Sequence, residues 1–255
     1  MSVYRDRYER FTASDEYRAS RTRKAKVIAH LCAPYLTGEA RVVDLGAGTG
    51  IVRKVLEVIS GNRIFGIEID GSFIAERERM VRGDVLRLPL ASESIDFAML
   101  NHLYEHVRDP GLLFEETYRI LRPGGRAYVT AGSRLAIMEP HYRLPFLSWL
   151  PRASASAYLR MTRKGRSYDD IRFLTYRPLT RLMRAAGFIV EDVTESAIDD
   201  LIQSTWGDPW AAVWGGIRKI PPGARHSLLR VGSPQWFFCL ERPARPGTVE
   251  ADGTA

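Results

Sequence analysis

The chain has 255 residues, and 45% of them are hydrophobic. This length allows one domain with insertions or two small domains. No stretch approaches the roughly 18 continuous apolar residues of a membrane span, and the start, MSVYRDRYER, lacks the apolar core of a signal peptide. The sequence therefore predicts a cytoplasmic protein.

The 37 Lys and Arg residues outnumber the 30 Asp and Glu residues, so the formal net charge is +7. Such a balance suits nucleic acid, an anionic membrane surface or an acidic substrate. The small basic clusters at residues 21–26 and 160–166 are typical of solvated faces, and we do not expect nucleic-acid binding. Cys32 and Cys239 lie in apolar contexts without metal-ligand spacing, which predicts reduced core residues.

Residues 1–36 are expected to be helical, with Val27, Ile28, Leu31 and Leu36 on an apolar face.

Residues 42–50, VVDLGAGTG, join a buried-strand pattern to a glycine-rich turn. Gly46, Gly48 and Gly50 let the backbone turn tightly and approach a ligand, because no Cβ is in the way. The apolar residues after the turn recur at helical spacing and are Ile51, Val55, Leu56 and Ile59. A helix there directs its free N–H groups back at the turn, so this order of elements predicts a nucleotide pocket.

Two details separate this turn from a dinucleotide-binding turn. Asp44 precedes the first glycine, where it would repel a pyrophosphate and hold a cationic ligand. The dinucleotide fingerprint also requires G-x-G-x-x-G, whereas the third glycine here comes one residue early and Ile51 stands in the expected position. The sequence therefore predicts a nucleoside ligand with a positively charged, phosphate-free tail.

Acidic residues follow the next two predicted strands. Residues 63–69, RIFGIEI, indicate a buried strand ending at Glu68, about 20 residues beyond the turn, where a carboxylate can accept both ribose hydroxyls. Asp70 is the alternative, and we favour Glu68 because it aligns with the strand end. Asp84 comes after a third short run, in GDVLRLPL.

The rest of the chain continues the alternation of strands and helices. Helices are expected from Asp109 and Pro110, as cap and first-turn residue, and at residues 179–186, with Gly187 past the end. Further strands are expected at residues 95–100, 126–132, 188–196 and 233–243. This pattern predicts a mostly parallel sheet covered on both faces, and the tail, residues 243–255, is expected to be disordered.

These motifs together resemble the class I S-adenosylmethionine-dependent methyltransferases, in particular the broad group with a GD…LP segment and an R-x-L-R-P-G-G turn, here residues 119–125, RILRPGG. The resemblance covers about residues 42–193. It implies an α/β fold with a Rossmann-like, doubly wound, mostly parallel seven-stranded sheet and an antiparallel edge strand. We therefore expect one methyltransferase domain at residues 1–242, with S-adenosyl-L-methionine as cofactor.

The resemblance also implies the cofactor-binding residues. Those expected at the methionine end are Asp44, Gly46, Ala47, Gly48, Asn101 and His102. At the other end, Glu68 would take the ribose hydroxyls and Ile69 would lie against the adenine. Asp84 would accept from the adenine amino group, with the Val85 backbone beside it.

Two stretches, residues 137–176 and 197–231, are left over and are expected to form a helical, aromatic cap that recognises the substrate. The first is too long for an ordinary loop, and its prolines prevent one continuous helix. It is similar to segments of methyltransferases in bacterial glycan and polysaccharide assembly, and it also suits contact with a membrane surface. The second contains Trp206, Trp210 and Trp214 at spacing four, with a helix start expected near Asp208.

Transfer to a hydroxyl needs a group that takes its proton. The candidate bases are His141, in the first insertion, and then His102, whereas His106 is expected to be structural at the start of the next helix. A metal held by Glu139, His141, Asp169 and Asp170 is an alternative, but no spacing requires one, and we expect none.

The sequence thus predicts O-methylation of a sugar or another hydroxylated small molecule. The alternatives are a lipid or quinone-like acceptor at a membrane surface, a non-catalytic cofactor-binding protein, and a nicotinamide-dependent oxidoreductase. The early third glycine and Asp44 disfavour the oxidoreductase.

Overall fold

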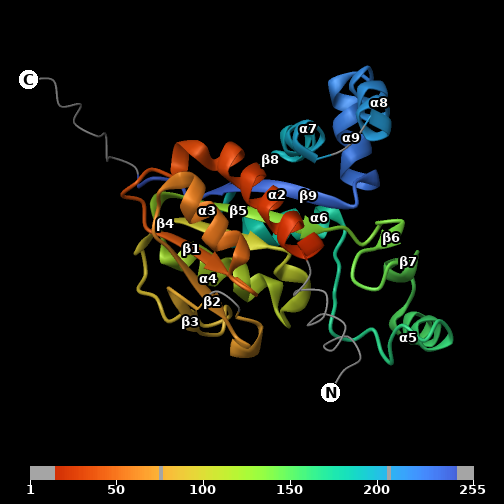
Figure 1. Ribbon diagram of the computed structural model, residues 1–255, viewed down its shortest axis with the longest axis horizontal. Coiled ribbons are helices and arrows are strands. Elements are labelled where there is room, and N and C mark those ends of the chain that lie inside the picture. Colours follow the sequence, from red (N-terminus) through yellow and green to blue (C-terminus); the bar gives the residue numbers. More distant parts are fainter. Residues whose placement is uncertain (1–14, 75–76, 206–207, 246–255) are drawn as a thin grey trace, which may run out of the picture.

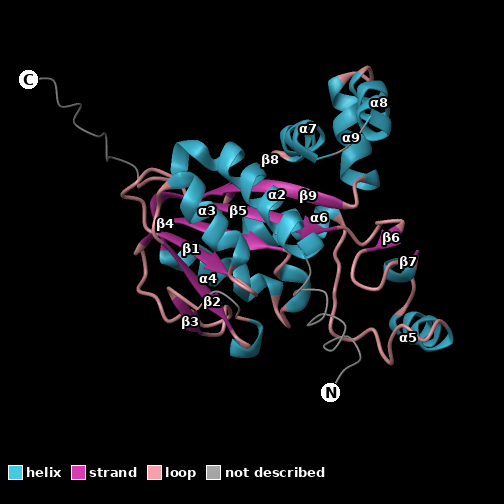
Figure 2. Ribbon diagram, viewed as in Figure 1, coloured by secondary structure: helices cyan, strands magenta, loops and turns pink. Residues whose placement is uncertain are grey.

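The structure is a computed structural model that describes residues 15–74, 77–205 and 208–245. A seven-stranded sheet runs through the molecule, and helices cover both of its faces (Figures 1 and 2). Its strands are β1 (Val42–Leu45), β2 (Ile64–Glu68), β3 (Met80–Arg82), β4 (Ile95–Asn101), β5 (Leu121–Gly132), β8 (Ile189–Asp192) and β9 (Gln235–Glu241). No helix in the described ranges is both long and apolar enough to cross a membrane.

The helices lie mostly between successive strands. They are α2 (Asp15–Cys32), α3 (Ile51–Ser60), α4 (Pro110–Ile120), α5 (Arg152–Met161), α6 (Tyr176–Ala185), α7 (Thr194–Thr205), α8 (Asp208–Arg218) and α9 (Pro222–Gly232). The short 3-10 helices are η1 (Ala33–Tyr35), η2 (Gly71–Phe73), η3 (Tyr104–His106) and η4 (Leu147–Trp149).

The strand order is β3-β2-β1-β4-β5-β9-β8. The first five strands in this order pair in parallel, whereas β9 is antiparallel to both β5 and β8. The antiparallel pairing therefore lies at the β8 edge, with β9 inside the edge strand. This arrangement confirms the predicted Rossmann-like, mostly parallel, seven-stranded sheet. Because β2 and β4 flank β1 on opposite sides, the strand order reverses beside β1, and ligands bind at the carboxyl ends of the strands at such a point.

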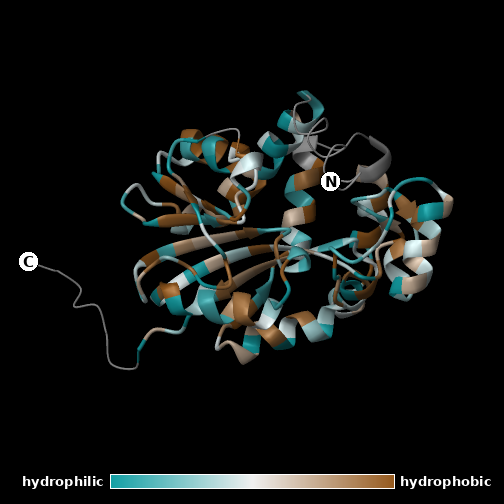
Figure 3. Ribbon diagram, turned by 90° about the horizontal axis from the view of Figure 1, so that it is seen from below, coloured by the Kyte–Doolittle hydropathy of each residue, from teal (hydrophilic) through white to brown (hydrophobic). Residues whose placement is uncertain are grey.

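The two faces of the sheet build two separate cores, because successive side chains of a strand point to opposite faces. On β1, Val42 packs with the apolar residues of α2 and α3, while Val43 and Leu45 pack with those of α4 and α6. Hydrophobic residues accordingly concentrate in the strands and on the helix faces against them (Figure 3). The predicted apolar face before β1 is confirmed, since Val27 and Ile28 are buried.

The structure bears on three other predictions, which concern the cysteines, the strand at residues 188–196 and the tail. Cys32 and Cys239 are free and buried, as predicted. The expected strand at residues 188–196 is wrong beyond Asp192, whose carboxylate accepts a hydrogen bond from the Thr194 N–H at 3.0 Å where α7 begins. Of the tail, the structure describes residues 243–245, and Arg245 pairs with Glu93 at 2.8 Å. Disorder stays a prediction for residues 246–255, which lie outside the described residues.

The first insertion, residues 137–176, folds into a hairpin of β6 (Met138–Glu139) and β7 (Leu144–Pro145), followed by η4, α5 and a return segment. It lies beyond one end of the sheet (Figure 1). Its buried side chains form an apolar cluster of its own, consisting of Tyr142, Leu144, Leu147, Ala155, Leu159, Tyr168, Ile171 and Phe173. The insertion is therefore an internally packed unit.

The second insertion, residues 197–231, consists of most of α7 with α8 and α9. The predicted helix start near Asp208 is confirmed, because α8 begins there. Trp214 is buried and donates from Nε1 to Oδ1 of Asp199 at 2.6 Å. Trp206 and the side chain of Trp210 lie outside the described residues. The role of both insertions as substrate caps stays a prediction.

Candidate functional site

The glycine-rich turn forms a tight loop between β1 and α3. Gly46 and Gly48 have φ angles of +67° and +55°, in the left-handed region that favours glycine. The N–H groups of Gly46 and Ala47 donate to the Ile67 carbonyl at 2.8 and 3.1 Å, which ties the turn to the end of β2. A Cβ on Gly46 would lie 2.5 Å from Cδ1 of Leu103. The turn thus requires glycine at position 46 for conformation and for space.

Glu68 ends β2 and reaches across to this turn. Its Oε2 accepts a hydrogen bond from the Gly48 N–H at 2.9 Å, and its Oε1 accepts from the Asp70 N–H at 3.1 Å. Asp70 instead turns its carboxylate toward Ser72, whose N–H and hydroxyl donate to it at 2.9 and 2.6 Å. Glu68 is therefore the acid fixed beside the turn, which supports it over Asp70 as the predicted ribose ligand.

Ile69, Asp84 and Val85 line the same cavity as Glu68. The Ile69 side chain is 59% exposed, so it offers apolar surface to a ligand where adenine is expected. Oδ1 of Asp84 accepts from the Leu86 N–H at 2.9 Å, which fixes the turn that carries Val85. Apolar surface beside a carboxylate suits a flat heterocycle with an exocyclic amine.

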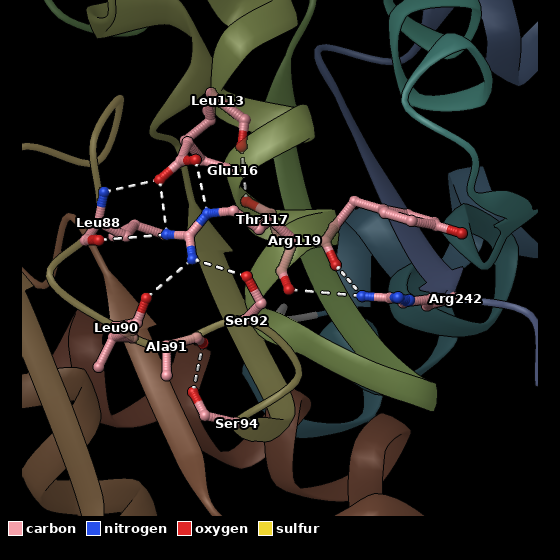
Figure 4. Close-up of polar contacts among 11 residues, drawn as sticks. Leu88, Leu90, Ala91, Ser92, Ser94, Leu113, Glu116, Thr117, Arg119 and Arg242 are labelled. Carbon is pink, nitrogen blue, oxygen red and sulfur yellow. Dashed lines mark hydrogen bonds and ion pairs between the residues drawn. The ribbon is translucent and has the colours of Figure 1, made fainter.

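Arg119 of α4 fixes the loop of residues 84–92 by hydrogen bonds (Figure 4). Its guanidinium donates to both carboxylate oxygens of Glu116, at 2.8 and 2.9 Å, and to the carbonyls of Leu90 and Leu88, at 2.9 and 3.2 Å. Glu116 also accepts from the Leu88 N–H at 2.8 Å. A bidentate arginine–carboxylate pair has a defined geometry, so the first arginine of RILRPGG positions the loop that carries Asp84.

Asp44 on β1 is buried and lines the cavity. Burial raises the pKa of its carboxyl group to about 7, although the charges of Arg53 and Lys24 lower it. Its Oδ1 and the Nδ2 of Asn101 form no hydrogen bond of standard geometry with the described residues, although a polar contact from Asn101 lowers the pKa of Asp44. A buried carboxylate oxygen without a partner is costly and suits a cationic group of a ligand. The residues therefore fit the positively charged tail that the sequence predicts.

Helix α2 adds cationic side chains to the cavity. Tyr17, Arg21 and Lys24 line it, and the Arg21 guanidinium lies over the Tyr17 ring at 4.5 Å. Burial lowers the pKa of Lys24 to about 7, and the charge of Arg21 lowers it too. The expectation of a solvated face at residues 21–26 is therefore wrong for these two side chains. Arg21 follows Tyr17 by four residues, and Lys24 follows Arg21 by three. This spacing in the sequence places all three side chains on one helical face, and it was the signal that could have indicated their position.

His102 follows β4 with a φ angle of +50°, which is uncommon for a residue with a Cβ. Its Nδ1 lies 3.0 Å from Oε1 of the fully buried Glu105. Burial lowers the pKa of His102 to about 4, and the charge of Lys24 lowers it further, while Glu105 raises it. His102 is therefore a neutral imidazole near pH 7, with Nδ1–H donating to Glu105 and Nε2 as an acceptor.

A second histidine–glutamate pair comes from the first insertion. Nδ1 of His141 lies 2.8 Å from Oε1 of the fully buried Glu139, whose Oε2 accepts from the Tyr142 N–H at 2.6 Å. On its other side, Nε2 of His141 lies 3.2 Å from Nε2 of His106. The insertion thus delivers its histidine to the carboxyl edge of the sheet.

The expected position of His106 at the start of the next helix is wrong, while its structural role stays a prediction. His106 lies in η3, ahead of α4, and lines the cavity instead of beginning the next helix. Burial lowers the pKa of His106, and the neighbouring His141 lowers it as well. Glu105, which was not predicted as a site residue either, accepts a hydrogen bond from Nδ1 of His102. Both lie within five residues of Asn101, where β4 ends at the cavity, and this nearness in the sequence was the available signal.

All eleven predicted site residues line one cavity of about 1120 Å³. This volume exceeds the roughly 300–1000 Å³ of most ligand pockets, so there is room for a cofactor and an acceptor together. Met138, Pro140 and Arg143 of the first insertion line it as well. Within the described parts of the chain, no three His, Cys, Asp or Glu side chains are arranged to hold a metal ion, so Asp169 and Asp170 do not join Glu139 and His141 as ligands.

Residues 43–129 match the model of a protein family described as a methyltransferase domain. A demethylmenaquinone methyltransferase from Mycobacterium sp. (strain KMS) is 31% identical over 159 residues, which are 58% of this chain and 67% of that protein. An uncharacterized 37.1 kDa protein in transposon TN4556 of Streptomyces fradiae is 29% identical over 167 residues, and the match spans 44% of its length and 59% of this chain.

A solved structure from Thermotoga maritima, a SAM-dependent methyltransferase described as a possible histamine N-methyltransferase, shares the fold. Its TM-score is 0.54 at 23% identity, and the match covers 94% of this chain and 96% of that one. The family match includes the glycine turn, Glu68, Asp84 and Asn101, which all line the cavity. The chain therefore belongs to the class I S-adenosylmethionine-dependent methyltransferases.

Proposed function

We propose that the protein transfers the methyl group of S-adenosylmethionine to an oxygen of a hydroxylated small molecule, such as a sugar. The observation that carries this proposal is that His102, His106 and His141 line the cofactor cavity, two of them held by buried glutamates. The bound cofactor supplies an electrophilic methyl group. The residues of the chain then have to orient the acceptor and remove its proton.

The proposed cofactor contacts follow the charges of the cavity. Asp44 offers its unpartnered Oδ1 to the α-ammonium group, and the cations of Arg21 and Lys24 suit the α-carboxylate. Glu68 accepts from the ribose hydroxyls, beside the backbone of the turn. The adenine lies against Ile69, with its amino group toward Asp84.

His141 is the proposed base. Its Nδ1–H donates to Glu139, which makes Nε2 the proton acceptor, on the side of the cavity where His106 stands. The buried charge of Glu139 stabilises the imidazolium that forms, as in other histidine–carboxylate pairs. His102 is a weak proton acceptor, because its pKa is lowered to about 4. Its proposed role is to border the methyl group.

A lipid or quinone-like acceptor is the second candidate. The similarity to a demethylmenaquinone methyltransferase favours it, and so does Met138, an apolar residue that lines the cavity and is 51% exposed. A reduced quinone carries phenolic hydroxyls, so the same base serves this acceptor. Loss of the phenolic proton raises the electron density on the oxygen and on the ring carbons.

The test uses cofactor with an isotopically labelled methyl group, offered with panels of sugars and of reduced quinones, and mass spectrometry of the products. We expect His141→Asn to lower turnover by roughly 100-fold or more, with unchanged affinity for S-adenosylhomocysteine. His30→Asn, on the exposed side of α2, is the matched control and should turn over normally. Loss of turnover in His102→Asn but not in His141→Asn would move the role of base to His102. Binding of S-adenosylhomocysteine without any labelled product would favour a non-catalytic role.

A further inference from the structure

An exposed apolar surface lies on the first insertion, at the β6–β7 hairpin. Its exposed fractions are 63% for Ile137, 51% for Met138, 47% for Phe146 and 45% for Trp149, and Pro145 is exposed as well. These five residues are called the hairpin patch. Large apolar side chains that gather in one exposed place mark an interaction surface more often than scattered ones do.

The hairpin patch is continuous. Met138 pairs with Pro145 across the hairpin, so the two side chains are neighbours on one face. Beside them, the Phe146 N–H donates to the Ile137 carbonyl at 2.6 Å. The Phe146 and Trp149 rings meet edge to face, with centroids 5.0 Å apart. Backbone pairing and ring contact thus join all five residues.

The rest of the hairpin is already packed, which leaves the patch without a role in the core. Glu139 and Leu144, on the opposite face of the two strands, are buried. Nε1 of Trp149 donates to the Ala136 carbonyl at 3.1 Å, so the polar group of the indole is satisfied within the chain. The part of Trp149 that faces solvent is therefore apolar ring.

The first insertion, which carries the hairpin patch, is rich in basic residues. Residues 137–176 include seven basic and three acidic residues, and one of the acids, Glu139, is buried against His141. Up to residue 166, the exposed arginines of the insertion are Arg143 in the turn of the hairpin, Arg152 and Arg160 on α5, and Arg163 and Arg166 beyond α5. Apolar and aromatic side chains within a basic surface complement an anionic lipid bilayer, which offers both an apolar interior and negative headgroups.

The hairpin patch is also continuous with the catalytic cavity. Met138 belongs to both, and Pro140 and Arg143, in the turn of the hairpin, line the cavity as well. A molecule that leaves a surface covered by the hairpin therefore meets the cavity directly.

We propose that the hairpin patch docks this protein on an anionic phospholipid surface. The apolar side chains enter the interface, and the exposed arginines of the same insertion bind the lipid phosphates. Docking places the mouth of the cavity at the bilayer, so an acceptor dissolved in the lipid reaches His141 without crossing water. The docking itself stands apart from the proposed methyl transfer, while delivery of a lipid acceptor rests on it.

The experiment is sedimentation of the full chain with vesicles of phosphatidylcholine and phosphatidylglycerol in equal parts, and with vesicles of phosphatidylcholine alone. We expect binding to the anionic vesicles and much weaker binding to the neutral ones. The double variant Ile137→Ser, Phe146→Asn should lose at least about tenfold in partitioning. Asparagine tolerates the left-handed conformation of Phe146, whose φ is +57°. Val58→Ser, at a residue that is 78% exposed on α3, is the matched control and should bind as the wild type does.

A second pair of variants tests the charges. Arg152→Glu reverses a charge in the first turn of α5, where an acidic side chain suits the helix dipole, and should weaken binding to anionic vesicles. Arg177→Glu makes the same change in the first turn of α6 and should leave binding unchanged.

Calorimetric binding of S-adenosylhomocysteine verifies that each variant is folded, and methyl transfer to a soluble acceptor reports on the catalytic proposal separately. The docking proposal is overturned if the wild type does not sediment with anionic vesicles, or if the double variant sediments as the wild type does. It is also overturned if the wild type dimerises without vesicles and the double variant abolishes both dimer and vesicle binding, because the hairpin patch would then join two copies of the chain.

Discussion

Nε2 of His141 and Nε2 of His106 lie 3.2 Å apart, although 35 residues separate them in the sequence. One histidine belongs to the first insertion and the other to η3 at the edge of the sheet. Two imidazole nitrogens at this distance share a single proton, because each can be either donor or acceptor. Since Nδ1–H of His141 points at Glu139, we assign that proton to His106. The contact therefore ties the insertion to the sheet. Nε2 of His141 accepts from His106 until the hydroxyl of an acceptor molecule displaces that N–H.

Replacing Glu139 by glutamine tests this assignment. The amide oxygen can still accept from the Tyr142 N–H, but the buried charge that stabilises an imidazolium is lost. We expect kcat to fall by roughly 100-fold, with little change in affinity for S-adenosylhomocysteine. Glu105→Gln makes the same change beside His102 and should have the smaller effect on kcat. A larger effect from Glu105→Gln would identify His102 as the base.

Gly46→Ala tests the need for space in the turn. Both Gly46 and Gly61 have positive φ angles, +67° and +75°, so alanine at either position is strained by about 1–2 kcal/mol. Only at Gly46 does the new Cβ meet Leu103, whereas at Gly61 it meets open space. We expect Gly46→Ala to lose most of its affinity for S-adenosylhomocysteine in calorimetry and Gly61→Ala to keep it. Equal affinities would remove Gly46 from the site.

Glu68→Ala and Asp70→Ala decide between the two acids. A hydrogen bond to a charged group contributes about 1.5–3 kcal/mol, so losing the acceptor of two ribose hydroxyls should weaken binding by roughly 100-fold or more. Asp70→Ala should remove the cap on Ser72 and cost less than about tenfold. Isothermal titration with S-adenosylhomocysteine measures both, and the reverse order would make Asp70 the ribose ligand.

The raised pKa of Asp44, about 7, predicts that cofactor binding depends on pH. Because burial disfavours the carboxylate, the folded chain without ligand carries this proton up to about neutral pH. Any stability that the group contributes is therefore present in acid and lost as the pH rises through about 7. A ligand ammonium group favours the ionised form, so binding releases the proton.

We accordingly expect the Lys24→Met variant to bind S-adenosylhomocysteine more weakly as the pH falls from about 8 to about 6. In the wild type, Lys24, whose pKa is lowered to about 7, takes up a proton beside the ligand carboxylate and offsets this dependence. Adding Asp44→Asn to the Lys24→Met variant should flatten its dependence. Lys24 titrates in the same range, and its charge lowers the pKa of Asp44, so Lys24→Met should move the transition to higher pH. Calorimetry in two buffers with different ionisation enthalpies counts the released protons. No proton release near pH 6 in the Lys24→Met variant would contradict the assignment.

Arg119→Lys tests whether the Arg119 guanidinium positions the loop of residues 84–92. Lysine keeps the charge but cannot reach Glu116 and the carbonyls of Leu90 and Leu88 at once. We expect a lower melting temperature and roughly tenfold weaker binding of S-adenosylhomocysteine, relieved in part by saturating ligand. Arg122→Lys, in the same motif but paired with Asp96, should leave the affinity unchanged. An unaltered affinity in Arg119→Lys would show that the loop keeps its conformation without the Arg119 hydrogen bonds.

The sequence by itself determined the fold and predicted the residues that line the proposed cofactor half of the cavity. Strand, glycine turn and helix are contiguous in VVDLGAGTG, and a positive φ at Gly46 is a local requirement that few residues meet. Glu68, Asp84 and Asn101 each end or follow a short apolar run. Carboxyl ends of parallel strands meet at one edge of a sheet, so residues there come together whatever the loops do.

Only the tertiary structure decided which residues line the proposed acceptor half of the cavity. The contact between His106 and His141 depends on how the first insertion packs on itself. No periodic pattern of residues in the sequence indicates that packing. The same holds for Lys24, which belongs to a basic cluster that reads as solvated until α2 is placed over the cavity. The hairpin patch was visible as apolar residues but not as exposed ones. Burial and long-range contact are properties of packed elements, and they are fixed only when the whole chain has found its place.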